Sequence, residues 1–139
     1  NGDPAGFNLN DCSTQRNLSE DGRKQAQRIG EFFNKNKIET DKVLSSEWCR
    51  CKETAKIAFK NYSTKSFLNS FYSAKFSKNK DKQVKAFNNY VKNLESKKNL
   101  ILVTHYVFIS EVLNYGPSSG EIVVSDKNLN IIGSIEIDF

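Results

Sequence analysis

The only histidine of the 139-residue sequence, His105, lies where an ionisable side chain could act on a bound ligand. It follows a short apolar run at residues 100–103 that is typical of a buried strand, and apolar residues at 109, 112 and 113 then recur at helical spacing. This pattern places His105 at the carboxyl end of a strand, where open α/β sheets bind ligands, and the following helix directs backbone N–H groups toward an anion. A hydrogen-bonded core histidine with a structural role is the alternative.

A second junction of the same kind carries an arginine. Residues 42–46 form a short predicted strand, and Ser46 can cap the helix predicted to run from there to residue 59. Arg50 falls in the first turn of that helix, and its planar guanidinium group suits two phosphoryl oxygens at once. Arg16, in the loop before the first helix, is a third candidate for a positive group near the ligand. The alternatives are a surface ion pair for Arg50 and a solvated charge for Arg16.

These junctions belong to an alternation of helices and strands. Ser19 is a good N-cap, with Glu20 and Asp21 in the first turn, for a helix whose apolar residues recur up to Phe33. The predicted order is a loop over 1–17, a helix over 19–33, a strand over 42–46, a helix over 46–59, irregular structure over 61–76, a helix over 81–96, a strand over 100–103, a helix after His105, and strands over 121–125 and 131–139. This order predicts one domain over 1–139, a three-layer α/β/α sandwich around a mixed, mostly parallel sheet.

Composition argues against several classes of function. The net charge of +5 comes mostly from lysines between residues 75 and 98, which lack interleaved aromatic residues, so no nucleic-acid partner is expected. No apolar run approaches the roughly 20 residues that cross a membrane, so no membrane partner is expected either. Cys12, Cys49 and Cys51 match no zinc-ligand spacing, which predicts no metal site. A disulfide from Cys12 to either Cys49 or Cys51 fits the sequence, which does not choose between them.

Three segments resemble the motifs of the histidine phosphatase superfamily, also called phosphoglycerate mutase-like, branch 1. The first motif begins the first helix, the second spans the strand and helix around Arg50, and the third ends the strand before His105. The matching residues are Leu18, Ser19, Gly22, Arg23, Gln25 and Ala26, then Ser45, Ser46, Arg50, Thr54 and Ala55, and finally Val103, Thr104 and His105. Other details, such as the sequence SGEIVV, resemble an uncharacterised bacterial subgroup in which many members carry an export signal.

The resemblance implies a fold, an activity and a set of site residues. The fold is the phosphoglycerate mutase-like sandwich, and the activity is phosphatase chemistry through a phosphohistidine, without metal or cofactor. The expected partners are a small phosphoester, a phosphohistidine substrate or inorganic phosphate. Arg50 and His105 are expected to bind the phosphoryl group, with Arg16, Thr104 and Ser46 at the substrate and Glu121 as a candidate proton donor. The stretch over 66–76 has no acidic residue, which argues against mutase activity of the usual type.

One family feature has no counterpart in the sequence, namely the Arg-His pair that ends the first strand and supplies the nucleophile. The flanks of His105 match the second histidine of the family instead. We therefore expect the nucleophilic histidine and the first strand to lie upstream of Asn1, so that the domain is N-terminally incomplete and inactive alone. A non-catalytic phosphate-binding or scaffolding domain is the main alternative, and a basic module for anionic polymers is a third hypothesis.

The same resemblance suggests where the protein works. An exported bacterial subgroup indicates a periplasmic or secreted protein, and an oxidising compartment suits a disulfide to Cys12. A cytoplasmic location is the alternative, because the cysteine count is odd. The oligomeric state is left open by the sequence.

Overall fold

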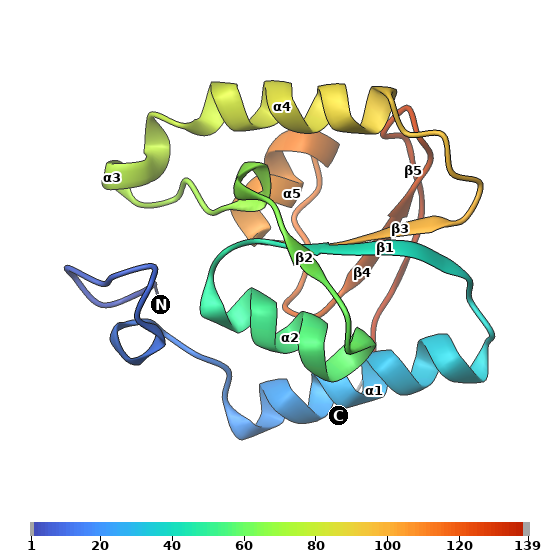
Figure 1. Ribbon diagram of the computed structural model, residues 1–139, viewed down its shortest axis with the longest axis horizontal. Coiled ribbons are helices and arrows are strands. Elements are labelled where there is room, and N and C mark those ends of the chain that lie inside the picture. The colour runs from blue at the N-terminus through green and yellow to red at the C-terminus, as the bar shows by residue number, and fades with distance from the viewer. Residues whose placement is uncertain (1, 138–139) are drawn as a thin grey trace.

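The computed structural model describes residues 2–137 and has a three-stranded parallel sheet at its centre (Figure 1). Strand β1 (Thr40–Ser45) pairs with β3 (Asn99–Val103) on one side and with β2 (Ser63–Thr64) on the other. In this register Ser45 lies opposite Val103, and the N–H of Ser46 donates to the Val103 carbonyl at 2.9 Å. Because the strands are parallel, the residues that follow β1 and β3 emerge at the same edge of the sheet.

Helices cover both faces of this sheet. Helices α1 (Glu20–Lys35) and α2 (Cys49–Phe59) pack together on one face, while α4 (Lys80–Lys92) and α5 (Tyr106–Leu113) lie on the other (Figure 1). Three short pieces complete the set, namely the 3₁₀ turns η1 (Cys12–Thr14) and η2 (Ser66–Leu68) and the one-turn helix α3 (Ala74–Ser77). The predicted three-layer α/β/α class is confirmed. Ser19 caps α1 as predicted, since its hydroxyl oxygen accepts from the Gly22 N–H at 3.1 Å.

The last two strands form a hairpin of their own. Strands β4 (Ile122–Ser125) and β5 (Ile131–Ile135) pair antiparallel, around a turn in which the Asp126 carboxylate accepts backbone N–H groups of Asn128 and Asn130. Within residues 2–137, β3 is an edge strand of its sheet, and the hairpin is a separate two-stranded sheet. The strands expected in one mixed sheet therefore lie in two. The hairpin is poorly covered, as the 70% exposure of Ile132 shows.

The main core lies between the sheet and the α4–α5 layer. Leu68 of η2 and Phe108 of α5 are at most 1% exposed, and Phe108 packs edge-on against Phe87 of α4 with ring centroids 5.1 Å apart. Leu44 of β1 and Val91 of α4 belong to the same cluster. These contacts hold α5, and with it the N-cap residue His105, against the end of β3.

The N-terminal segment, defined here as residues 2–17, is fastened to the start of α2. A disulfide joins Cys12 to Cys49, which resolves the pairing that the sequence left open, and Cys51 is a buried free thiol. The side-chain carbonyl of Gln15 accepts from the Cys49 N–H at 3.0 Å, and the Phe7 ring packs on Trp48 with centroids 5.7 Å apart. The segment is irregular, as predicted, but it is anchored at several points.

Several predicted boundaries differ from the structure for local reasons. Helix α2 begins at Cys49 with Trp48 as its N-cap, so the prediction that Ser46 caps it is wrong. Instead, the side-chain oxygen of Gln15 accepts the N–H of Cys49, the first residue of the helix. The Ser46 hydroxyl oxygen accepts the N–H of the preceding residue, Trp48. Helix α4 ends at Lys92 rather than 96, and β5 ends at Ile135; residue 139 of the predicted last strand lies outside the described residues. The two-residue β2 and the short helical pieces were not predicted, because they are too short to show a period.

Gly30 of α1 lies against the backbone of Ala58 in α2, and this contact gives a stability test. A Cβ at residue 30 would lie 2.5 Å from the backbone oxygen of Ala58, which is shorter than real contacts allow. We expect Gly30→Ala to lower the free energy of unfolding by up to about 2 kcal/mol, because an overpacking cost of about 1–3 kcal/mol outweighs the roughly 1 kcal/mol that alanine gains in helix propensity. Urea unfolding measures the change.

Gly133→Ala is the matched control, since a Cβ there meets nothing within 4 Å. It should change the free energy of unfolding by less than about 0.5 kcal/mol. A Gly30→Ala protein as stable as the parent would mean that the two helices can separate at no cost.

Candidate active site

The parallel pairing of β1 and β3 brings Ser46 and His105 together. His105 is the residue before α5, is only 7% exposed, and places Nε2 2.8 Å from the Ser46 hydroxyl oxygen. The Trp48 ring packs edge-on against the imidazole, with ring centroids 5.2 Å apart. His105 is therefore fixed in position by a hydrogen bond and by a wall of aromatic carbon.

A network of hydrogen bonds behind Ser46 sets the tautomer of the imidazole. The Ser46 oxygen accepts from the Trp48 N–H at 3.1 Å and lies 3.2 Å from Asn69 Oδ1, to which the hydroxyl donates. Asn69 is itself held by Glu47, whose N–H donates to Oδ1 and whose carboxylate accepts from Nδ2, both at 2.8 Å. Since the one Ser46 proton is used toward Asn69, the network assigns the hydrogen on Nε2 to His105, which donates to Ser46.

Arg50 lies in the first turn of α2 and contacts the N-terminal segment. Its Nη1 donates to Asp3 Oδ1 at 2.9 Å and to the Arg16 carbonyl at 3.4 Å. The Asp3 carboxylate also accepts from the Trp48 Nε1–H at 3.0 Å and from the Arg16 N–H at 3.0 Å. Burial opposes the ionised form, but these hydrogen bonds and the charge of Arg50 together lower the pKa of Asp3. The ion pair expected as an alternative for Arg50 is therefore present, at a largely buried position.

Burial and a neighbouring positive charge keep His105 uncharged. Burial and, to a smaller extent, the neighbouring charge of Arg50 lower the pKa of His105 to about 3, while Asp3 acts in the opposite direction. Arg50 is therefore the fixed positive charge beside a neutral imidazole. A ligand with negative charge would reverse the balance at His105, because an anion favours the imidazolium form.

Cys51 lines the same site, but its thiol is unreactive. Its Sγ lies 3.6 Å from His105 Nε2 and 3.7 Å from the Thr104 carbonyl. Burial raises the pKa of the Cys51 thiol to about 12, so the thiolate that would act as a nucleophile is not formed near neutral pH. Cys51 is part of the packing around the imidazole.

The other predicted site residues have different surroundings. Thr104 follows β3, but its hydroxyl donates to the Leu68 carbonyl at 2.5 Å, which ties η2 to the strand end. The backbone of Arg16 belongs to the Asp3–Arg50 cluster, and Arg16 is exposed. Glu121 is not joined to this cluster: it accepts from Tyr115 Oη at 2.5 Å and from the Ser118 N–H at 2.8 Å. Those hydrogen bonds lower the pKa of Glu121, which makes it a poor proton donor.

Sequence reasoning missed the residues that orient the site from a distance. Asp3, Gln15 and Asn69 each contact a residue at the start of α2 or just before it. Asp3 and Gln15 lie in a stretch with no hydrophobic period, and Asn69 lies in a region predicted to be irregular. The single usable signal was that Asp3 is an acidic residue in the same polar N-terminal stretch as the candidate Arg16.

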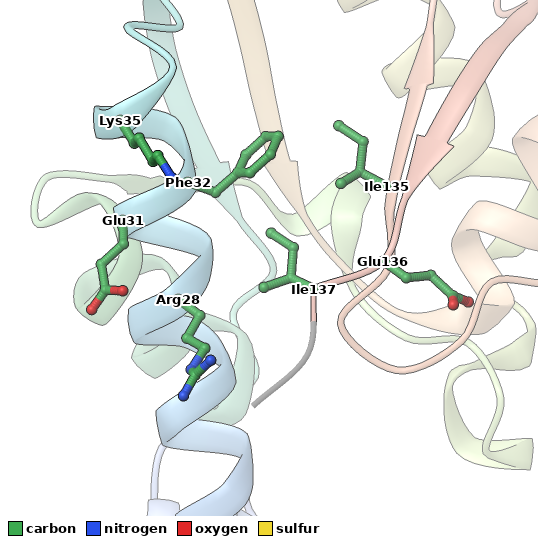
Figure 2. Close-up of a pocket in the computed structure, with 7 residues that line it drawn as sticks. All are labelled: Arg28, Glu31, Phe32, Lys35, Ile135, Glu136 and Ile137. Atoms are coloured by element: carbon green, nitrogen blue, oxygen red, sulfur yellow. The ribbon is translucent and has the colours of Figure 1, made fainter.

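A shallow cavity of about 390 Å³ opens between α1 and the end of the hairpin (Figure 2). Phe32 projects from α1 toward Ile135 and Ile137, and charged side chains stand around them. None of the predicted site residues lines this cavity, so it is separate from the cluster around His105.

Among the described residues, no group of three or more His, Cys, Asp or Glu side chains is placed to hold a metal, and no helix is long and apolar enough to cross a membrane.

Comparison with known proteins supports one fold and one family. The model of the histidine phosphatase superfamily (branch 1) matches residues 11–68, which include Arg16, Ser46 and Arg50. The structure is similar to TTHB049 from Thermus thermophilus, with a TM-score of 0.61 and 19% identity over 88% of this chain and 85% of that one. It is also similar to the product of open reading frame Rv3214 from Mycobacterium tuberculosis, with a TM-score of 0.52 and 15% identity over 72% and 68% of the two chains. No protein of curated function matches the sequence significantly.

The low pKa of His105 predicts how stability depends on pH. A pKa lowered from 6.5 to about 3 by folding means that the unfolded chain binds a proton that the folded chain does not. The stabilisation is complete above pH 6.5 and is lost as the pH falls toward 3. Between pH 7 and pH 5 the parent should lose about 2 kcal/mol more stability than His105→Asn, in buffers without phosphate.

Urea unfolding at the two pH values measures both losses. His105 is the only histidine, so no other imidazole contributes to the difference. Equal losses in the parent and in His105→Asn would show that the imidazole is accessible to protons in the folded state.

Proposed function

We propose that this chain, whose residues 11–68 match the model of the histidine phosphatase superfamily (branch 1), is a metal-independent phosphatase acting through a phosphohistidine on a small phosphoester or phosphohistidine substrate. Arg50 and His105 bind the phosphoryl group. The observation that carries the proposal is that the partly buried guanidinium of Arg50 lies close enough to the buried imidazole of His105 to shift its pKa, at the common edge of β1 and β3. In phosphoryl transfer, preorganised positive donors around the equatorial oxygens are the main requirement.

His105 changes its protonation state when the phosphoryl group binds. With no anion beside it the imidazole is neutral, since burial and Arg50 lower its pKa to about 3. A phosphoryl dianion beside it raises that pKa, because the anion stabilises the charged ring. The proton taken up turns His105 into a charged donor for a phosphoryl oxygen, while Ser46 holds the ring in place through Nε2.

The remaining site residues have supporting roles in this proposal. Arg16 is exposed next to the Asp3–Arg50 cluster and supplies positive charge at the mouth. Thr104 acts by fixing the end of β3 through the Leu68 carbonyl. Glu121 remains a candidate proton donor by sequence, but its lowered pKa and its bonds to Tyr115 and Ser118 favour an acid from elsewhere, or a leaving group that needs little protonation.

The nucleophile is the part of the chemistry that these residues do not supply. A phosphohistidine mechanism needs an imidazole that attacks phosphorus and a second that binds the phosphoryl group, and the 139 residues hold one histidine. We propose that the attacking histidine comes from polypeptide upstream of Asn1. The open edge of β3 and the separate β4–β5 hairpin support this, because an added strand could pair there and end near His105.

A phosphate-binding domain without turnover is the second candidate. The single histidine favours it, since binding needs only Arg50 and His105. The two candidates predict the same affinity for phosphate and differ in hydrolysis alone.

We also propose a periplasmic or secreted location, with the cytoplasm as the alternative. The Cys12–Cys49 disulfide supports an oxidising compartment. Alkylation under denaturing conditions, applied to protein taken directly from its native cells, should find one reactive thiol, that of Cys51. Three reactive thiols would place the protein in a reducing compartment.

The catalytic proposal is tested with a chain extended upstream of Asn1 by its natural sequence. We expect hydrolysis of an aryl phosphate in the presence of EDTA. Arg50→Ala should reduce kcat/KM by about 10²–10³, since it removes the charged donor that stabilises the transition state. His105→Ala should cause a loss of similar order.

Arg28→Ala is the matched control, because Arg28 is an exposed arginine of α1 that lines the separate cavity in Figure 2. It should leave kcat/KM unchanged. Unchanged turnover in both Arg50→Ala and His105→Ala would contradict the catalytic proposal. Saturable phosphate binding without turnover in the extended chain would favour the phosphate-binding domain instead.

A further inference from the structure

The Asp3 carboxylate is the one acidic group bonded directly to Arg50 among the described residues. Oδ1 accepts from Arg50 Nη1 at 2.9 Å and from the Arg16 N–H at 3.0 Å, while Oδ2 accepts from Trp48 Nε1–H at 3.0 Å. We infer that Asp3 is a positioning residue that fixes the guanidinium of Arg50 for phosphate. This inference rests on the proposed function, because it concerns the same phosphate-binding arginine.

The contacts of Arg50 use only one part of its guanidinium group. Among residues 2–137, both hydrogen bonds of the group, to Asp3 and to the Arg16 carbonyl, involve Nη1. Within this part of the chain, Nη2 and Nε therefore keep their donors for a ligand. A guanidinium held at one nitrogen is restrained in rotation and still offers a planar pair of donors to two phosphoryl oxygens.

Asp3 is itself held firmly enough to restrain another side chain. Its side chain is 10% exposed, compared with 22% for Arg50. The N-terminal segment that carries it is fastened by the Cys12–Cys49 disulfide and by the packing of Phe7 on Trp48. The carboxylate is a charged acceptor at every pH used for binding, since its three hydrogen bonds and Arg50 lower its pKa.

Two effects of Asp3 on phosphate oppose each other, and they differ in their response to salt. The negative charge of Asp3 repels an anion bound at Arg50, and this Coulombic effect is screened within about 3 Å at 1 M ionic strength. The positioning of Arg50 by Asp3 favours phosphate binding. Without Asp3, the Arg50 side chain would lose more conformational entropy when the ligand orders it. Salt weakens the first effect and leaves the second, although it weakens it less than it would between exposed charges, because Asp3 is 10% exposed. A titration in high salt therefore favours detection of the positioning role, and Asp3→Asn, which removes the charge but keeps an acceptor, separates the two effects.

The experiment is calorimetric titration of the 139-residue chain with inorganic phosphate at pH 7.5, in low salt and in about 1 M NaCl. In high salt, Asp3→Ala should bind phosphate about tenfold more weakly than the parent, the order expected from losing one hydrogen bond to a charged group. Asp3→Asn should fall between the two, because its amide oxygen can still accept from Arg50. Asp11→Asn is the matched control, since Asp11 lies in the same segment and, among the described residues, its carboxylate accepts hydrogen bonds only from the N–H and hydroxyl of Ser13.

A spectroscopic readout separates positioning from a loss of fold. The ¹⁵N resonances of the Arg50 side chain should show slow rotation of the guanidinium in the parent and in Asp11→Asn, and faster rotation in Asp3→Ala. Circular dichroism checks that each variant is folded. Equal or tighter phosphate binding by Asp3→Ala in high salt, or unchanged guanidinium rotation, overturns the inference.

The failure of this inference is distinguishable from the failure of the proposed function. If Arg50→Ala abolishes phosphate binding while Asp3→Ala leaves it unchanged, Arg50 binds phosphate without help from Asp3 and only the inference fails. If the parent chain binds no phosphate, or Arg50→Ala binds as tightly as the parent, the proposed function fails at this site and the inference with it.

Discussion

Parallel pairing of β1 with β3 is the constraint on which the rest of the structure depends. The register that sets Ser45 opposite Val103 brings Ser46 within 2.8 Å of His105, although the two are 59 residues apart in the chain. A slip of one residue would turn every side chain of β3 to the other face of the sheet. The buried Leu44 therefore does more than fill the core, because its packing holds the register that places the imidazole.

The parts of the site that the sequence predicted are those set by local structure. A strand end and the first turn of a helix are visible as changes of period, so the positions of His105 and Arg50 followed from a few residues on either side. The choice of disulfide partner was not local. Residues 49 and 51 are roughly 200° apart around a helix, so only one of them faces the N-terminal segment, and which one depends on how α2 packs. The structure selects Cys49, and burial of Cys51 follows from the same packing.

The residues that sequence analysis did not identify act across long separations from irregular segments. Asp3 reaches Arg50 across 47 residues, Gln15 reaches the start of α2 across 34, and Asn69 reaches Glu47 across 22. No period marks such residues, because each contributes one polar side chain and no repeating face. The error over Ser46 has the same origin. A serine before a helix is a reasonable cap by local rules. In the structure, however, the side chain of Gln15 accepts the hydrogen bond from the first N–H of α2, and Ser46 is hydrogen-bonded to His105 instead.

The charge balance among Arg50, Asp3 and His105 suits a dianion in the proposed function. Arg50 carries the positive charge, Asp3 offsets part of it, and His105 stays neutral because burial and Arg50 lower its pKa to about 3. A single negative charge entering this site meets a guanidinium that is already partly compensated. A second negative charge makes it favourable for His105 to take up a proton, so the imidazole adds a positive donor only when the ligand is strongly charged. In the proposed function, discrimination for a phosphoryl dianion thus comes from the cost of charging a buried imidazole.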